Sequence, residues 1–341
     1  MIGAQFTEEL LLLTEEDIRS VLIGRDTEIL ELVRRTYELH AKGECNAPRS
    51  AFLRISIERQ ERAIALPALV GGDLPLCGLK WVASYPNNVN RGGNRASALV
   101  ILNSLDTGYP TCVLEGAWIS SLRTAAGAVL AARALYGREV RCLGLIGAGR
   151  INFEVMRILR VVTPDLAEVL VCDEAPASID RFAAAAARLD LNVRINGAPD
   201  AAAVLRNCGL ISIATSATAP HIHSLDGLHR DAVILHLSLR DLVPKVLIEC
   251  ANYVDDPDHA LSEGTSLALA VAYKRADQLV SGTLAGLLSQ RQQRPANRVA
   301  VFSPFGMGIL DIAVAGFVER EARIRGLGTR APHFTKAPWY A

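Results

Sequence analysis

Basic side chains occupy unusual places in the N-terminal part of this chain. Lys80 lies inside the apolar run Leu79-Lys80-Trp81-Val82-Ala83, and Arg123 lies inside an alanine-rich stretch. A lysine within a buried strand is costly unless an anion meets it. Several such cations in one small domain predict a pocket for carboxylates, because charge-assisted pairs are the strong ones. Taken singly, each cation is also compatible with a snorkelling side chain or a structural ion pair. The predicted substrate set here is Arg49, Arg54, Lys80, Arg95 and Arg123.

A carboxylate follows an apolar run in the second half of the chain. Residues 233–239 have strand character and lead into Arg240 and Asp241. Ligands of parallel sheets bind beyond the carboxyl ends of the strands. Asp241 is therefore predicted to accept a proton or to orient a water molecule, with Arg240 beside it. The alternative for Asp241 is a cap of the helix that begins near Pro244.

Polar residues near this strand extend the predicted site. Thr215 and Ser216 end the preceding strand and are predicted to contact a cofactor ribose by the same argument. His236, inside an apolar strand, is interpreted as a hydrogen-bonded core histidine. His221 and His223 have metal-like spacing, but no third ligand lies nearby in the sequence, so no metal is expected.

A glycine turn predicts the cofactor. The apolar run 141–146 breaks at Gly147-Ala148-Gly149 and continues as an amphipathic segment that begins with Arg150 and Ile151. In such a strand–turn–helix unit, backbone N–H groups and the helix N-terminus face a pyrophosphate. Asp173, after the next strand, can accept both hydroxyls of an adenosine ribose and would repel a 2′-phosphate, which favours NAD over NADP. Asn152 stands where the fingerprint has its third small residue.

These residues require an alternating α/β domain to position them. From about residue 140 onward, strands alternate with helices, which is typical of a parallel sheet covered on both faces. The strands are predicted at 141–147, 167–172, 193–195, 209–215, 232–239 and 298–302. A glycine-bearing turn around Gly306 follows the last of these; it is predicted either to present N–H groups to a nicotinamide carboxamide or to serve as a hinge between domains.

The region before residue 125 has a different pattern. A helix is predicted to begin after Thr14, which caps Glu15-Glu16-Asp17, and another covers about 27–41. A strand-rich segment punctuated by glycine and proline turns follows, and then an alanine-rich helix over about 116–136. The last helix, about 308–325, returns to this region. We therefore expect an α/β protein with a Rossmann-type domain at 125–308 and a discontinuous α+β domain at 1–124 with 309–341.

Composition excludes several classes of partner. The chain has 341 residues, half of them hydrophobic, and its 36 Lys and Arg residues equal its 36 Asp and Glu residues. Because these charges balance, the protein has no net positive charge that would attract nucleic acid or an anionic membrane. No apolar run has the length of a membrane span, and acidic residues near the N-terminus argue against a signal peptide. Seven cysteines without paired spacing indicate reduced thiols in a cytoplasmic protein.

Taken together, the motifs resemble the ornithine cyclodeaminase/μ-crystallin family. The resemblance rests on stretches spread in the family's order along nearly the whole chain: Pro48-Arg49, Gly78 to Trp81, Asp106-Thr107-Gly108, Arg123 to Ala126, Gly147 to Gly149, Arg240 to Lys245 and Phe302 to Asp311. It implies a homodimer formed through the N-terminal domain, substrate carboxylate binding by Arg49, Lys80 and Arg123, and Asp241 as the catalytic acid/base with Lys80 assisting. The expected cofactor contacts are Thr124, Gly147, Ala148, Gly149, Arg150, Ile151, Asp173, Thr215, Ser216, Ser238 and Gly306.

Within the family, the segments Lys80 to Ala98 and Leu235 to Asp241 look most like the branch that makes 2,3-diaminopropionate, a building block of siderophores and peptide antibiotics. Its dehydrogenases act on N-(2-amino-2-carboxyethyl)-L-glutamate, whose three carboxylates would give Arg54, Arg95 and Arg240 partners. The segment before Asp241 departs from ornithine cyclodeaminase proper, where a Gly-Gly-Asp sequence is expected. Three alternatives stay open: ornithine cyclodeaminase, a related alanine or imine dehydrogenase, and a non-catalytic nucleotide- or ligand-binding protein.

Overall fold

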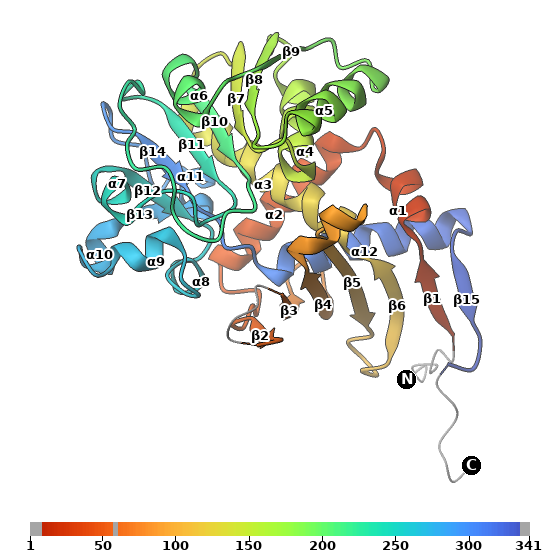
Figure 1. Cartoon of the computed structure of the whole chain (residues 1–341). Helices are drawn as coiled ribbons and strands as arrows, with labels where there is room; N and C mark the ends of the chain where they lie inside the picture. The colour runs from red at the N-terminus through yellow and green to blue at the C-terminus, as the bar shows by residue number, and fades with distance from the viewer. Residues whose placement is uncertain (1–8, 57–60, 335–341) are drawn as a thin grey trace. The chain divides into compact units, whose positions relative to one another are not determined.

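The computed structural model describes residues 9–56 and 61–334. The chain divides into two compact units, Met1–Arg123 with Met307–Ala341, and Thr124–Gly306. The first division lies inside a helix, α3 (Ala117–Tyr136). The two units are described separately below (Figure 1).

The first unit is built on a seven-stranded sheet. The strands are β1 (Leu10–Leu13), β2 (Ala51–Arg54), β3 (Arg62–Val70), β4 (Leu76–Ser84), β5 (Ala96–Asn103), β6 (Pro110–Glu115) and β15 (Thr329–Ala331), in the order β15-β1-β6-β5-β4-β3-β2. All pairs are antiparallel except β1 with β6, which is parallel. A short 3₁₀ helix, η1 (Pro86–Arg91), connects β4 to β5.

Helices cover one face of this sheet. They are α1 (Glu15–Leu22), α2 (Asp26–Ala41) and α12 (Gly308–Arg325), and α12 lies across β3, β4 and β5 (Figure 1). The predicted cap at Thr14 is present, and Thr14 forms a capping box with Asp17. Gly316 allows α12 to approach the sheet, since a Cβ there would lie 2.4 Å from the Leu76 side chain. α12 ends at Gly326, which adopts the left-handed conformation expected at a helix end.

The second unit is a parallel sheet of eight strands. They are β7 (Cys142–Ile146), β8 (Glu168–Cys172), β9 (Arg194–Gly197), β10 (Leu210–Ile213), β11 (Val233–His236), β12 (Ala251–Val254), β13 (Val280–Thr283) and β14 (Ala300–Phe302), in the order β13-β12-β14-β11-β10-β7-β8-β9. Strand order reverses at β7, which has β8 on one side and β10 on the other. Such a reversal marks the ligand-binding edge of a doubly wound sheet, so the expected Rossmann-type fold is confirmed.

The helices of this unit connect its strands. They are α4 (Arg150–Val162), α5 (Pro176–Arg188), α6 (Ala201–Asn207), α7 (Pro244–Glu249), α8 (Pro257–Ala260), α9 (Ser266–Ala270), α10 (Ala276–Leu279) and α11 (Leu284–Leu288). Strands β7, β10, β11 and β14 are buried along nearly their whole length, as expected of a sheet covered on both faces. In the described part of the chain, no helix has the length and apolar character needed to cross a membrane.

Candidate functional site

Lys80 belongs to a buried charge cluster in the first unit. Its ammonium group lies 2.7 Å from Asp311 Oδ2 and 3.1 Å from Ser120 Oγ. Arg123 reaches the other oxygen of the same carboxylate, with Nε 3.1 Å from Asp311 Oδ1. The three charged side chains are at most 9% exposed. One carboxylate therefore pairs with two cations, and the cluster carries a net charge of +1 when both are protonated.

Local structure explains how these residues meet. Lys80 stands opposite Leu66 on β3 and Val100 on β5, which are buried, so its side chain lies on the helix-covered face of the sheet. Arg123 and Ser120 are one turn apart on α3 and share a face. Asp311 lies in the first turn of α12, where a carboxylate is favoured by the helix dipole.

Burial and charge change the acidity of Lys80. Removal of the ammonium group from water lowers its pKa, and the nearby positive charge of Arg123 lowers it further. Asp311 opposes both effects, and the resulting pKa is about 8. Lys80 can therefore gain or lose a proton near neutral pH, a property suited to an acid/base group.

The other predicted cations are placed differently. Arg49 and Arg54 are exposed, and the Arg54 guanidinium lies 5.8 Å from the Phe52 ring centre. Arg95 is half-buried before β5. Arg240, in the second unit, donates from Nη2 to the Glu263 carbonyl at 2.9 Å. The substrate contacts expected of these four arginines stay predictions.

The glycine turn follows β7 in the second unit. Gly147 has φ of +95°, and a Cβ there would lie 2.4 Å from the Ala214 carbonyl oxygen, so the position requires glycine. Gly149 is exposed and faces open space. It precedes α4, whose N-terminus has no side-chain cap. The first N–H groups of α4, including those of Arg150 and Ile151, are thus arranged as an anion site would need them.

Asp173 closes the turn from the neighbouring strand. Its Oδ2 accepts a hydrogen bond from the Ala148 N–H at 2.8 Å, and its Oδ1 accepts one from the Ala175 N–H at 2.9 Å. These bonds hold the half-buried carboxylate beside the glycine turn, as the predicted ribose contact requires.

Asn152 has a structural explanation. The side chain is fully buried, and its amide group donates to the carbonyl oxygens of Ile146 and Gly147 at 3.0 and 2.7 Å. Its own oxygen accepts from Ser212 Oγ on β10 at 2.7 Å. The amide therefore joins the glycine turn to the neighbouring strand. The Asn152 side chain occupies space that would be empty if the third residue of the fingerprint were glycine.

Asp241 lies at the centre of a polar cluster beyond the ends of β10 and β11. Its carboxylate is fully buried and accepts hydrogen bonds from Thr215 Oγ1 and Ser238 Oγ, and His236 Nε2 lies 3.1 Å from Oδ2. Burial alone raises the pKa of Asp241, but His236, Ser238 and Thr215 outweigh it and lower the pKa to about 2. Asp241 is thus a carboxylate held in its ionised form, not the cap of a nearby helix.

The backbone before Asp241 is held in an uncommon conformation. Leu239 has φ of +68°, a region that β-carbon-bearing residues rarely adopt. Its carbonyl accepts from the Ser266 N–H at 2.7 Å, and the Asp241 carbonyl accepts from the N–H groups of His221 and Ile222 at 2.8 and 2.9 Å. Strain of this kind is typical of functional sites.

The turn around Gly306 has a protein partner. The N–H groups of Phe305 and Gly306 donate to the fully buried Asp255 carboxylate at 3.0 and 2.6 Å. Gly306 N–H would have to leave Asp255 to meet a nicotinamide, so its cofactor role stays a prediction, as do those of Thr124 and the exposed Ser216.

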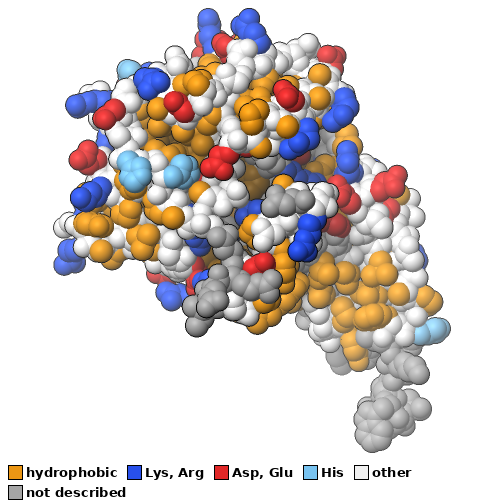
Figure 2. Space-filling view, viewed as in Figure 1, with side chains coloured by type: hydrophobic (Ala, Val, Ile, Leu, Met, Phe, Trp, Pro, Cys, Tyr) orange, Lys and Arg blue, Asp and Glu red, His pale blue; other side chains and the backbone are white. Residues whose placement is uncertain are grey.

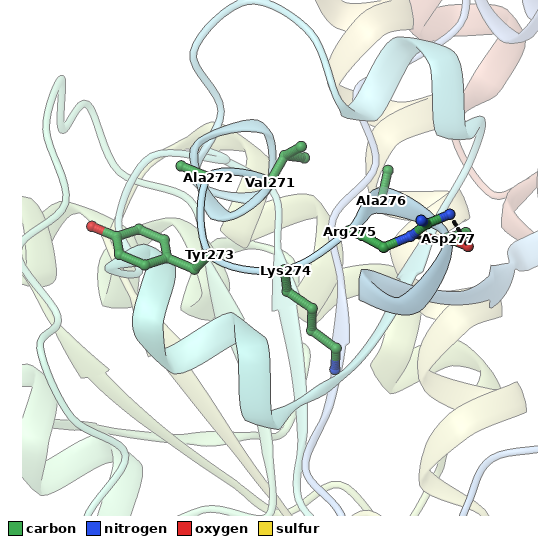
Figure 3. A pocket seen from close by; sticks show the side chains of 7 residues that line it. All are labelled: Val271, Ala272, Tyr273, Lys274, Arg275, Ala276 and Asp277. Carbon is green, nitrogen blue, oxygen red and sulfur yellow. Dashed lines mark hydrogen bonds and ion pairs between the residues drawn. The ribbon is translucent and has the colours of Figure 1, made fainter.

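A separate surface cavity of about 710 Å³ is lined by residues 271–277. Figure 3 shows Arg275 turned toward Asp277, with which it makes a salt bridge of 3.1 Å, and Tyr273 pointing away from them. The cavity lining contains none of the predicted site residues. No three His, Cys, Asp or Glu side chains within 9–56 and 61–334 gather as a metal site would require.

Two contributing side chains, Asp311 and Ser303, are not identified from the sequence. Lys80 requires an anionic partner, but no sequence pattern assigns that role to Asp311. His236 is buried and hydrogen-bonded as interpreted, and the structure identifies Asp241 as its partner. Ser303, 3.4 Å from His236 Nδ1, carried no signal of its own.

Comparison with known proteins supports the resemblance. Residues 10–325 match the model of the ornithine cyclodeaminase/mu-crystallin family. The N-((2S)-2-amino-2-carboxyethyl)-L-glutamate dehydrogenase of Staphylococcus aureus is 27% identical over 94% of this chain and 98% of its own. The crystal structure of CmnK has a TM-score of 0.87 at 27% identity, covering 95% and 98% of the two chains. An archaeal alanine dehydrogenase dimer with bound NAD has a TM-score of 0.84 at 25% identity, covering 95% and 99%.

Proposed function

Since the chain belongs to the ornithine cyclodeaminase/mu-crystallin family, we propose that it is an NAD-dependent oxidoreductase that acts on a C–N bond of an amino acid. The proposed substrate is N-(2-amino-2-carboxyethyl)-L-glutamate, and the products are L-2,3-diaminopropionate and 2-oxoglutarate. A relative named for activity on this substrate aligns along nearly the whole chain. The observation that carries the proposal is the buried Lys80–Arg123–Asp311 cluster, whose net positive charge suits a substrate carboxylate.

The second unit fits a bound dinucleotide. Gly149 faces open space, so a phosphate can approach the backbone there, and α4 begins without a side-chain cap. Asp173 stands beside the turn and would bind the adenosine ribose. NAD⁺, when bound, supplies the hydride acceptor that oxidises the substrate amine to an imine.

The remaining steps are assigned to residues of the chain. Arg49, Lys80 and Arg123 hold a carboxylate of the substrate and fix its orientation, which supplies much of the rate enhancement in reactions of bound substrates. Asp241 orients the water that adds to the imine carbon. The resulting carbinolamine then collapses to the oxo acid and the amine. The other carboxylates of the substrate are assigned to Arg54, Arg95 and Arg240.

Absorbance at 340 nm tests this proposal. Purified protein mixed with NAD⁺ and the proposed substrate should accumulate NADH, with 2-oxoglutarate formed in equal amount. Asp241→Asn should bind NAD⁺ like the wild type and lose turnover by about a hundredfold or more, the loss expected when an acid/base group is removed. Absence of NADH with this substrate would refute the substrate assignment.

A second candidate shares the fold. The buried cluster has one net positive charge, because Asp311 neutralises one of its two cations, and this number suits a substrate with a single carboxylate. Alanine, the substrate in the name of the archaeal relative, has one carboxylate. NADH formed with alanine but not with the larger substrate would favour this candidate.

The same assay separates the remaining alternatives. Ornithine cyclisation would consume ornithine without net NADH, and NAD binding without any turnover would indicate a non-catalytic member.

A homodimer is part of the proposal. On the face of the first sheet opposite the helices, Leu12, Val113, Ile101, Leu79 and Pro67 stand opposite one another across five strands. The next row includes Trp81 and Leu99, which are 37% and 39% exposed. Figure 2 shows hydrophobic side chains gathered over β6 and β1. An apolar face of this extent is typical of a protein interface, and the archaeal relative is a dimer by name.

A cytoplasmic location also belongs to the proposal, supported by seven free thiols.

A further inference from the structure

His236 Nε2 has two partners, and both are atoms of Asp241. The backbone N–H of Asp241 points at this nitrogen from 3.2 Å, and the carboxylate Oδ2 lies 3.1 Å from it. The N–H needs a ring nitrogen without a proton, whereas the carboxylate needs one that carries a proton. One nitrogen cannot satisfy both at once, so the same position has a partner for either protonation state.

The second ring nitrogen of His236, Nδ1, also has a partner that suits either protonation state of the ring. Nδ1 lies 3.4 Å from Ser303 Oγ, and a hydroxyl group can either donate or accept a hydrogen bond. His236 and Asp241 are both fully buried, which keeps bulk water from exchanging with the proton between them. The ring therefore has a satisfactory set of partners both as a neutral imidazole and as an imidazolium.

Asp241 by itself is a weak proton acceptor. Its carboxylate accepts from two hydroxyl groups, Thr215 Oγ1 on one oxygen and Ser238 Oγ on the other, and such bonds favour the ionised form. The two hydroxyl-bearing residues are half-buried, unlike Asp241 and His236. A proton from a reactant would reach the carboxylate on the side of these hydroxyl groups, and His236 is the ring that lies against the same carboxylate.

We propose that His236 and Asp241 act as one acid/base unit in which the transferred proton is held on His236 Nε2. The inference rests on the proposed function in that water is the reactant. As the water oxygen bonds to the substrate carbon, one O–H bond breaks and a proton passes through Asp241 to Nε2. Nε2 then stops accepting from the Asp241 N–H and donates to Oδ2. The same proton returns by the reverse route to the amine as the C–N bond breaks. The carbinolamine O–H proton also passes to the amine, which leaves as an ammonium ion, so the unit ends as it began.

Nitrogen NMR of the full chain tests the inference without substrate. With ¹⁵N-labelled histidine, the ring signals of His236 are identified by their loss in His236→Gln. In the substrate-free wild type we expect Nε2 without a proton and Nδ1 with one, because Nε2 accepts from the Asp241 N–H and must be able to take up the transferred proton. A wild-type Nε2 that already carries a proton would overturn the proposal, whatever substrate the enzyme uses.

Turnover with the proposed substrate gives the second measurement. Gln at position 236 keeps a donor near Asp241 but cannot take up a proton, so His236→Gln should lower kcat by about a hundredfold while NAD⁺ binding stays within about twofold of wild type. His229→Gln, at an exposed position outside the site, is the matched control and should keep wild-type kcat.

A His236→Gln protein that binds NAD⁺ and keeps kcat would overturn the proposal, because it would show that the imidazole only positions Asp241. If His236→Gln does not fold, His236→Asn serves to identify the ring signals, and the nitrogen pattern of the wild type still decides. An inactive wild type contradicts the proposed function and leaves the NMR result intact.

Discussion

Replacement of Lys80 by methionine should change how the stability of the first unit depends on pH. Lys80 is fully buried, and its pKa falls from 10.5 to about 8 because burial and Arg123 outweigh Asp311. Below pH 8 both the folded and the unfolded protein hold this proton, so the full cost of the buried ammonium is present. Above pH 8 the folded protein releases the proton while the unfolded chain keeps it up to about 10.5. Stability therefore rises with pH across this window.

The magnitude follows from the size of the shift. Each pKa unit corresponds to about 1.4 kcal/mol, so a shift of about 2.5 units amounts to roughly 3 kcal/mol over the whole window. About 2 kcal/mol of this gain falls between pH 7.5 and 9.5. Lys80→Met fills a similar volume and has no proton to release, so the variant should lack this gain.

Urea unfolding at the two pH values measures the effect. Trp81 and Trp118 both lie in the first unit, so their fluorescence reports on its unfolding. The free energy of unfolding of the wild type should rise by about 2 kcal/mol relative to Lys80→Met, and groups common to both proteins cancel in the comparison. Lys42→Met, at an exposed position of the same unit, is the control and should follow the wild type. Parallel changes in wild type and Lys80→Met would refute the account of burial given for Lys80.

Three further predictions concern packing and assembly. Asn152→Gly restores the third glycine of the fingerprint and should destabilise the second unit by about 1–3 kcal/mol, because Ser212 Oγ and two carbonyls lose a buried partner. Thermal unfolding measures this effect, and an unchanged or higher Tm would contradict the prediction. Leu239→Gly should be more stable than Leu239→Ala by about 1 kcal/mol, the reverse of the usual order, since only glycine relieves the positive φ; the usual order would show that the backbone is unstrained. Leu99→Glu should convert a dimer into a monomer in light-scattering measurements, whereas Leu189→Glu, exposed in the second unit, should not; a dimeric Leu99→Glu would refute the interface.

The regular elements could be predicted because their signals are local. The last helix was expected at about 308–325 and is observed at Gly308–Arg325, and the strand expected at 167–172 is Glu168–Cys172. β12 and β13 were not predicted. Each has four residues, too few to establish a periodicity, and each becomes a strand by pairing with distant parts of the chain.

The need for an anion beside Lys80 was predictable because the sequence itself contains an inconsistency. A lysine inside an apolar strand requires an anion, and the structure provides one, while the substrate contact of Lys80 stays a prediction. The anion is Asp311, 231 positions away, and no local pattern connects the two residues. The positive φ of Leu239 was equally hidden, because leucine rarely adopts it and the cause lies in the surrounding hydrogen bonds.

The pairing of Asp311 with two cations also limits how such a sequence can evolve. Loss of Asp311 leaves two buried cations without a counter-ion, and an uncompensated buried charge typically costs about 3–5 kcal/mol, comparable to the whole stability margin of many domains. Loss of Lys80 or Arg123 instead leaves the other cation paired with Asp311. A single substitution of Asp311 is therefore expected to be the most deleterious of the three. Exposed cations such as Arg49 and Arg54 have no such restriction. Divergence in substrate preference is thus expected to accumulate at the exposed cations, while Asp311 is retained as long as both buried cations are present.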